Sequence, residues 1–180
     1  MTDAIDIRAL DASAANVEAL AALLVQTVAA GGSVSFMHPL PLGDARAFWS
    51  KALTQADAGE RIVFGAFVAD QLAGTVTLLL DQPPNQPHRG EIAKMMTAVA
   101  HRGRGVARSL LRAAESAAAG RARTLLTLDT ASEEGAAGLY EKQGWIRCGE
   151  IPDFALKPHG GLVGTILYYK RLQPIAQAMV

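Results

Sequence analysis

The chain has 180 residues, of which 50% are hydrophobic and 19% are charged, so it can bury a continuous core and is not a disordered segment. Its 17 basic residues balance its 17 acidic residues, and this neutral balance excludes a global field that would hold nucleic acid or an acidic membrane. Any anion site must therefore be local. The length predicts a single domain over residues 1–172, followed by a loosely attached tail over residues 173–180.

Cysteine usage and the amino terminus bear on the compartment. Cys148 is the single cysteine, so it forms no internal disulfide, and we expect a cytoplasmic protein in which this side chain is a small buried hydrophobe. The first residues carry acids where a secretory signal needs bases, and the longest apolar stretch, Ala19–Val25, is too short to span a bilayer. We expect no membrane partner.

The first part of the chain predicts one strand and two helices. Apolar and polar residues alternate over Ile5–Leu10, which is the period of a half-buried strand. Apolar residues at three- and four-residue steps predict an amphipathic helix over Ala14–Ala30, with two glycines after it. A weaker pattern predicts a second helix over Pro41–Ala56, with Phe48 and Leu53 facing inward.

The middle of the chain predicts three strands and a long helix. The runs Arg61–Val68 and Gln71–Leu80 are separated by two residues, which favours an antiparallel hairpin. Three prolines in Asp81–His88 predict a loop. A strand over Gly90–Val99 then leads through a glycine-rich turn to a helix that ends at Ala119.

The strand predicted over Leu125–Asp129 follows that helix directly. A strand, helix and strand in so short a stretch imply a right-handed crossover, and therefore a parallel strand pair. Next, Ser132 is a candidate cap of another helix that opens at Ser132–Glu134 and ends near Gly144.

Two final strands are predicted over Trp145–Glu150 and Leu162–Arg171. Pro152–Gly161, between them, is predicted to be a long loop. Together with Pro39–Asp44 and Asp81–His88, this loop is expected to form the mouth of a site.

The strongest chemical signal is the glycine-rich turn over Arg102–Ala107. Glycines allow close backbone approach, the amino end of the following helix favours negative charge, and Arg102 and Arg104 add guanidinium groups. This combination is typical of a pyrophosphate site, although an ordinary glycine turn with solvated arginines is the alternative. Arg108 stands where a dinucleotide fingerprint needs its third glycine, and the Gly-Lys-Ser/Thr ending of a P-loop is absent.

The same turn resembles a known family motif. Arg102, Gly105 and Ala107 fit the Arg-x-x-Gly-x-Ala acetyl-CoA-binding motif of the GNAT family of N-acetyltransferases. Tyr140 and Gly144–Trp145 resemble that family's later Phe/Leu-Tyr-x-x-x-Gly-Phe element. Three segments are most similar to the tabtoxin-resistance type of acetyltransferase, namely Leu126–Thr130, Gly149–Pro152 and Thr165–Lys170.

The resemblance implies an α/β (α+β mixed) fold. It consists of a mostly antiparallel central sheet of six to seven strands, flanked by about four helices, with a splayed parallel strand pair. It also implies acetyl-CoA as cosubstrate, with the pantetheine arm lying between the splayed strands. Many relatives carry Asn near the end of the second of these strands, where this chain has Asp129–Ser132. The residues expected to bind acetyl-CoA are Met96, Thr97, Ala98, Val99, Arg102, Gly103, Arg104, Gly105, Val106, Ala107 and Ser132.

Acetylation of an amine needs proton transfer. An amine of pKa about 10.4 is mostly protonated at neutral pH, so a base must remove a proton before attack. Glu91 and Asp129 are the candidate bases, because they stand on the two strands expected to flank the gap, although both could be solvated strand-end acids. Tyr140 is the candidate acid for the departing thiolate, the alternative being a core tyrosine.

The functional expectation is direct acetyl transfer to a primary amine of a small molecule, such as an amino-acid-like toxin or antibiotic. The alternatives are a protein or peptide amine as acceptor, or a non-catalytic CoA-binding regulatory module. Long loops closing over the mouth would favour a small molecule, and an open groove would favour a peptide. The four histidines show no ligand spacing, so no metal is expected. The chain is expected to be a monomer or a homodimer.

Overall fold

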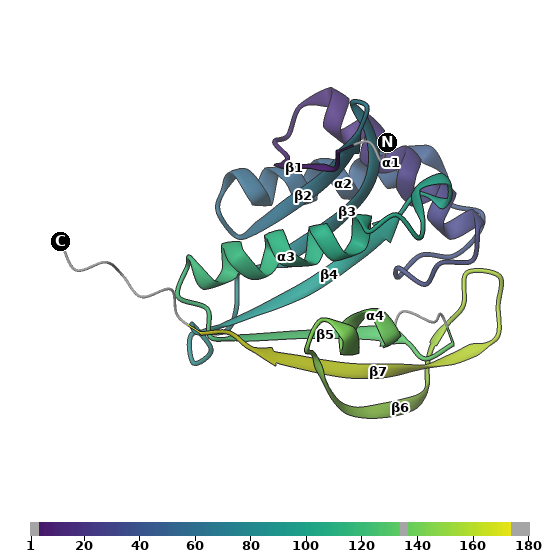
Figure 1. Ribbon diagram of the computed structural model, residues 1–180. Coiled ribbons are helices and arrows are strands. Elements are labelled where there is room, and N and C mark those ends of the chain that lie inside the picture. The colour runs from purple at the N-terminus through teal and green to yellow at the C-terminus, as the bar shows by residue number, and fades with distance from the viewer. Residues whose placement is uncertain (1–3, 134–136, 174–180) are drawn as a thin grey trace.

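A computed structural model describes residues 4–133 and 137–173. These residues contain a seven-stranded sheet in the order β1-β2-β3-β4-β5-β7-β6 (Figure 1). All neighbouring strands are antiparallel except β4 and β5, which are parallel. The mixed, mostly antiparallel sheet that the sequence predicts is therefore confirmed. The strands are β1 Asp6–Ala9, β2 Arg61–Val68, β3 Gln71–Leu79, β4 Arg89–Thr97, β5 Leu125–Ala131, β6 Ile146–Leu156 and β7 Leu162–Arg171.

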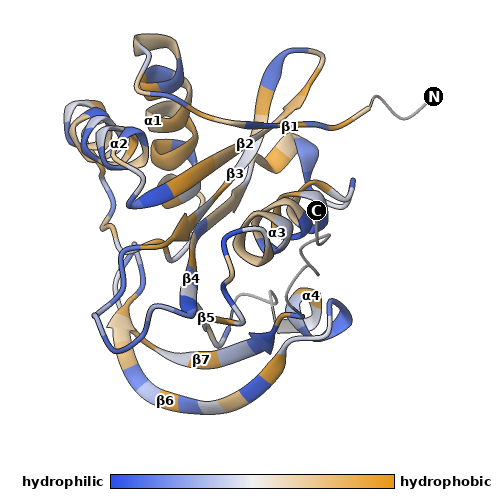
Figure 2. Ribbon diagram, turned by 90° about the vertical axis from the view of Figure 1, so that its left-hand side faces the viewer, coloured by the Kyte–Doolittle hydropathy of each residue, from blue (hydrophilic) through white to orange (hydrophobic). Residues whose placement is uncertain are grey.

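The helices cover both faces of this sheet. Figure 2 shows α1 and α2 on one side of strands β2 to β4 and α3 on the other. Helix α1 begins after Ser13, whose hydroxyl accepts a hydrogen bond from the Asn16 amide over 3.4 Å. The helices are α1 Ala14–Ala29, α2 Leu42–Asp57, α3 Val106–Ala119 and α4 Ala137–Lys142, with a short 3-10 helix at Val99–His101.

Each face of the sheet has its own core. On the α3 side, Val106, Leu110 and Leu111 pack against buried residues of β3 and β4. On the other side, α1 and α2 bury Trp49 and Leu53 completely against the sheet. The two cores fix the sheet between its helices, so the ends of β4 and β5 are held on a rigid frame.

Strands β4 and β5 separate along their length. Their register contains three pairs, Arg89 with Leu125, Gly90 with Leu126 and Glu91 with Thr127. Both strands are fully described, and beyond Glu91 they form no further pair, while β5 stays paired with β7 as far as Ala131. A wedge therefore opens between β4 and β5 toward their carboxyl ends.

A bulge in β4 shapes one wall of this wedge. The register between β3 and β4 shifts between Thr75 and Thr77, and Lys94 has a φ of +52°. Ile92 lies in the core under α3, whereas Met96 lies in the core under α1 and α2. Residues an even number apart face the same side of a regular strand, so the bulge turns the strand over between these two positions.

The predicted loop Pro152–Gly161 is wrong in its first half, because β6 continues to Leu156. Strand β6 lies at the edge of the sheet, where the missing N–H of a proline such as Pro152 costs no hydrogen bond between strands. The register shift between Ile151 and Ala155 absorbs the irregular backbone around it. Cys148, which we expected to be buried, is exposed on this edge strand.

The other predicted elements agree with the structure to within about two residues at each end, as expected for boundary assignments. Gly144 ends α4 with a φ of +80°. Ser132 and Glu133 lie in a turn, and the described part of α4 begins at Ala137. The predicted first turn at Glu134 and the tail beyond Gln173 lie outside the described residues.

Candidate active site

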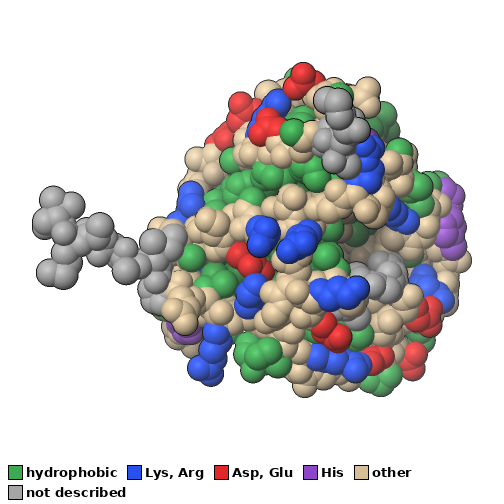
Figure 3. Space-filling view, viewed as in Figure 1, with side chains coloured by type: hydrophobic (Ala, Val, Ile, Leu, Met, Phe, Trp, Pro, Cys, Tyr) green, Lys and Arg blue, Asp and Glu red, His purple; other side chains and the backbone are tan. Residues whose placement is uncertain are grey.

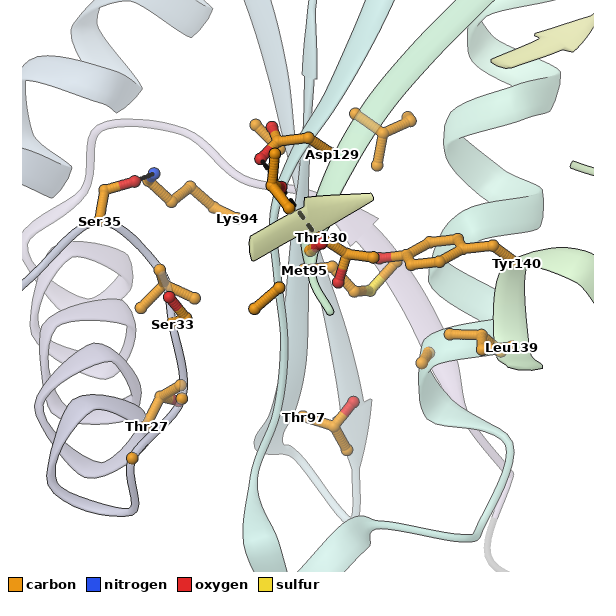
Figure 4. A pocket seen from close by; sticks show the side chains of 18 of the residues that line it. Thr27, Ser33, Ser35, Lys94, Met95, Thr97, Asp129, Thr130, Leu139 and Tyr140 are labelled. Carbon is orange, nitrogen blue, oxygen red and sulfur yellow. Dashed lines mark hydrogen bonds between the residues drawn. The ribbon is translucent and has the colours of Figure 1, made fainter. Parts of the chain in front are cut away.

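The wedge opens into a cavity of about 840 Å³ (Figure 4), a volume typical of small-molecule sites. One wall is formed by β4 and the segment after α1, and the opposite wall by β5, α4 and the β6–β7 hairpin. The glycine-rich turn before α3 lies along the same cavity. Predicted site residues that line it are Thr97, Arg102, Gly103, Gly105, Val106, Ala107, Asp129 and Tyr140.

The glycine-rich turn has the geometry of an anion site. Gly103 and Gly105 have φ values of +71° and +86°, and no heavy atom lies within 4 Å of a Cβ built on either glycine. Gly105 is the N-cap of α3 and no side chain caps this helix. The amides of Val106 and Ala107 are in its first turn and therefore have no intrahelical acceptor. Space, amides and helix dipole together fit a pyrophosphate.

Arginines add positive charge beside this turn. Arg102 and Arg104 are both exposed, and Arg102 lines the cavity. A guanidinium nitrogen of Arg104 lies 3.5 Å from His101 Nδ1, and Arg104 is outside the lining. Figure 3 shows lysine and arginine side chains spread over the face that carries α3, with acidic side chains between them. The positive charge that a phosphate needs therefore comes from the arginines beside the glycine-rich turn, as expected for a chain whose overall charge is balanced.

Of the residues at the end of β4 that are expected to bind acetyl-CoA, Thr97 lines the cavity, whereas Met96, Ala98 and Val99 do not. The Met96 side chain is buried in the core under α1 and α2. The Ala98 amide donates to the Ala73 carbonyl over 2.9 Å, so it is used within the sheet. Val99 is exposed at the start of the 3-10 helix.

Ser132 also lies outside the cavity lining. Its amide donates to the Gly164 carbonyl of β7 over 2.9 Å. A Cβ at Gly164 would come within 3.1 Å of the Ser132 hydroxyl, so the turn after β5 packs closely against β7.

The two candidate bases occupy different depths of the wedge. Glu91 lies at the last β4–β5 pair, and one of its oxygens is 3.3 Å from an Arg89 guanidinium nitrogen that also donates to Thr127. Asp129 is exposed to the cavity, where its Oδ2 accepts a hydrogen bond from the Thr165 hydroxyl over 2.9 Å. The structure therefore brings Asp129 into the cavity and leaves Glu91 at its base, outside the lining.

Lys94 is a cavity residue that our sequence analysis did not identify. Its Nζ donates to the Ser35 hydroxyl over 2.9 Å and lies 5.9 Å from the centre of the Phe48 ring. Burial lowers the pKa of Lys94, while the carboxylates of Asp129 and Glu91 act in the opposite direction. The signal in the sequence is a single charge within the otherwise apolar run that follows Glu91.

Tyr140 combines a core position with a place in the cavity wall. Its side chain is 4% exposed, and its ring lies 6.1 Å from that of Trp145 and 5.7 Å from that of Tyr168. Figure 4 shows the Tyr140 ring entering from the side opposite Lys94, with its hydroxyl end toward Thr130. The packing holds the phenol at the cavity.

The predicted mouth is correct in only one of its three segments. Within the described chain, neither Pro39–Asp44 nor Asp81–His88 contributes to the cavity lining. Asp81–His88 precedes β4, and since β4 and β5 are paired at their amino ends, this loop lies at the opposite end of the sheet. The segments that line the opening are Gly31–Ser35 and Phe154–Leu156.

Close to these two segments, the α1–α2 segment and the β6–β7 hairpin are joined by a contact that we term the roof. It is made by His38, Pro158 and His159, which do not themselves line the cavity. The His38 amide donates to the carbonyl of the buried Pro158 over 2.9 Å. The two histidine rings lie 4.5 Å apart, and His159 Nε2 is 3.1 Å from the Ala29 carbonyl oxygen. The β6–β7 hairpin thus closes against the α1–α2 segment (Figure 1).

Two kinds of site are absent from residues 4–133 and 137–173. No group of three or more His, Cys, Asp or Glu side chains in these ranges is arranged to hold a metal ion. None of the helices in the same ranges has the length and apolar character needed to cross a bilayer.

Comparison with known proteins gives one family. The sequence model described as the acetyltransferase (GNAT) family matches residues 34–145. An N-acetyltransferase from Staphylococcus aureus has a similar structure, with a TM-score of 0.80 at 18% identity, covering 94% of this chain and 99% of the other. A ribosomal-protein-alanine N-acetyltransferase from Brucella melitensis gives 0.77 at 22% identity, covering 93% and 99%. The yncA protein of Salmonella typhimurium, solved with its cofactor acetyl-CoA, gives 0.76 at 17% identity, covering 97% and 98%.

Proposed function

Because the chain belongs to the acetyltransferase (GNAT) family, we propose that it transfers the acetyl group of acetyl-CoA directly to the primary amine of a small, amino-acid-like molecule such as a toxin or an antibiotic. The matched region contains both the glycine-rich turn and Tyr140. The observation that favours a small acceptor is the roof, which joins the α1–α2 segment to the β6–β7 hairpin next to residues of both that line the cavity.

The residues present fit acetyl-CoA, which supplies an activated acetyl thioester. The amides at the start of α3 and the guanidinium of Arg102 would hold its pyrophosphate. Beyond Glu91, the β4 edge that faces β5 has no strand partner. Its main-chain groups can therefore bond an extended pantetheine arm in the manner of an added strand.

The side chains in the wedge can carry the proton transfers. Asp129 accepts a proton from the ammonium group of the acceptor, directly or through water, so that the amine nitrogen can bond to the acetyl carbon. Tyr140 donates its hydroxyl proton to the sulfur as the carbon–sulfur bond breaks, and the second proton of the acylated nitrogen passes through water to the resulting tyrosinate. Glu91, at the base of the wedge, adds negative charge that attracts a cationic acceptor.

The fold alone does not choose the acceptor, since one solved relative acts on the alanine of a ribosomal protein. A peptide needs a groove that is open at both ends, whereas the contact between His38 and Pro158 links the α1–α2 segment to the β6–β7 hairpin beside the cavity. A regulatory CoA-binding module would not need a carboxylate and a phenol at the same cavity. The cavity therefore favours catalysis on a small acceptor.

The test is calorimetry with acetyl-CoA followed by a thiol-release screen of amino acids, polyamines, aminoglycosides and peptides. Binding with turnover on small amines supports the proposal. Turnover confined to peptides would support the protein-acetylating alternative, and binding without any turnover would support the regulatory one. Absence of acetyl-CoA binding would overturn the assignment as a whole.

A further inference from the structure

Lys94 reaches the cavity through the bulge in β4. A non-glycine residue with a φ of +52° is uncommon, and such a conformation persists only where the surrounding structure holds it. Bulges can redirect a side chain, and here Lys94 faces Ser35 and Phe48, on the α1–α2 side of the sheet. The backbone irregularity thus places an ammonium group in the wedge.

This ammonium group has hydrogen-bonding capacity left over. It carries three donors, of which one is directed at Ser35. Among the residues that the structure describes, no carboxylate lies within ion-pair distance of its Nζ, and Asp129 and Glu91 act on it only from farther away. A half-buried cation without a close counter-ion is costly, so this arrangement points to an anionic ligand.

We propose that Lys94 and Ser35 form a subsite for the carboxylate of the acceptor, so that the enzyme acetylates α-amino-acid-like zwitterions in preference to simple amines. The Ser35 hydroxyl oxygen accepts a hydrogen bond from Lys94, so the hydroxyl proton of Ser35 is left to donate to the same carboxylate. Asp129, on β5 across the wedge, offers a negative charge to the ammonium group of the acceptor. This inference rests on the proposed function and names its substrate class.

The anion in question is distinct from the pyrophosphate of acetyl-CoA. The glycine-rich turn opens α3, on one side of the sheet, whereas Lys94 contacts the segment between α1 and α2, on the other. Figure 4 shows Lys94 and Tyr140 on opposite sides of the cavity. Positive charge at Lys94 is thus placed to recognise the acceptor.

The test compares matched acceptors that differ by one carboxylate: L-leucine with isoamylamine, L-phenylalanine with phenethylamine, and L-lysine with cadaverine. For the wild-type enzyme we expect kcat/KM to be about tenfold to a hundredfold higher for the acid of a pair, the range of a charge-assisted hydrogen bond. In Lys94→Met this ratio should fall to about one, and Lys94→Arg should retain most of it. Lys51→Met removes the same charge from an exposed position on α2 and should keep the wild-type ratio.

Calorimetric titration of the same compounds into the enzyme–CoA complex provides a readout that does not need turnover. Tighter binding of the acids to wild type, lost in Lys94→Met, supports the subsite. Equal affinity for acid and amine, or a preference that survives in a folded Lys94→Met variant, overturns it. Turnover without acid preference would remove the subsite alone, whereas failure to bind acetyl-CoA would remove the proposed function as well.

Discussion

Thr165 on β7 and Asp129 on β5 are joined by a hydrogen bond in which the threonine hydroxyl donates to Asp129 Oδ2 over 2.9 Å. The same hydroxyl lies 3.2 Å from the Thr130 carbonyl oxygen, and because it has one proton, the two acceptors compete for it. Thr165 is only 3% exposed, whereas Asp129 faces the cavity. A buried hydroxyl therefore orients an exposed carboxylate and leaves its other oxygen for the acceptor.

Replacing Thr165 with valine should preserve the shape of the buried side chain while removing this orientation. We expect kcat/KM to fall about tenfold, the effect of losing a hydrogen bond to a charged group. Thr165→Ser keeps the hydroxyl and should stay near the wild-type value. Steady-state kinetics of both variants test the idea, and a Thr165→Val enzyme as active as Thr165→Ser would refute it.

The two carboxylates of the wedge should differ in importance. Asp129→Asn should lower kcat by about a hundredfold or more, the usual contribution of a positioned base. Glu91→Gln should have a smaller effect, because Glu91 lies outside the cavity lining and contacts Arg89. Equal losses of kcat in the two variants, measured under saturating acetyl-CoA, would show that Glu91 takes part in the reaction as directly as Asp129.

Local sequence signals are sufficient to predict many of the strands and turns that surround this site. Two strand-like runs separated by two residues predict the hairpin of β2 and β3 almost to the residue. The glycine-rich turn is likewise predictable, since glycine permits the positive φ values found at Gly103 and Gly105. These features depend on neighbours along the chain.

The parts that escape sequence analysis depend on contacts between distant segments. Lysine rarely adopts a positive φ, so no local pattern predicts that the bulge at Lys94 turns β4 over. The roof depends on Pro158 meeting His38, more than a hundred residues away along the chain. The continuation of β6 past Pro152 depends on its edge position, which is a property of the sheet order.

The glycine-rich turn offers a matched pair of substitutions. Gly105 and Gly59 have φ values of +86° and +79°, and a Cβ at either meets no atom within 4 Å, so alanine at each position is opposed by the backbone alone. Both variants should lose about 1–2 kcal/mol of unfolding free energy. Only Gly105→Ala should also weaken acetyl-CoA binding, by about tenfold, since Gly105 lines the cavity beside the first amides of α3 and Gly59 does not. Comparable acetyl-CoA affinity in the two variants, by calorimetry, would exclude this turn as the pyrophosphate site.

Tyr140 and its neighbour Tyr168 allow the acid role to be separated from aromatic packing. Tyr140→Phe should lower kcat by about a hundredfold while the affinity for acetyl-CoA holds, because the phenol acts on the departing sulfur. Tyr168→Phe removes a hydroxyl that donates to Glu141 over 3.1 Å and should leave kcat near wild type. Burial and that hydrogen bond raise the pKa of Tyr168 above its ordinary value. A Tyr140→Phe enzyme with wild-type kcat across the pH range would rule out the acid role.

The position of Lys94 should also reduce stability in a pH-dependent way. Burial lowers its pKa in the folded state below the unfolded value of 10.5, so the unfolded chain binds the proton more readily. The penalty is therefore complete below the folded pKa, and stability rises with pH between the two values as the penalty is relieved.

Lys94→Met, which removes this titration, should accordingly be more stable than wild type at about pH 7, and the difference should shrink as the pH approaches 10.5. Lys51→Met, at an exposed position, should show no such pH-dependent difference. Urea unfolding of the three proteins from about pH 7 to pH 10 measures this directly. If the stability difference between Lys94→Met and wild type stays constant or grows with pH, the folded protein already stabilises the ammonium group. The argument that an external anion is its partner would then fail.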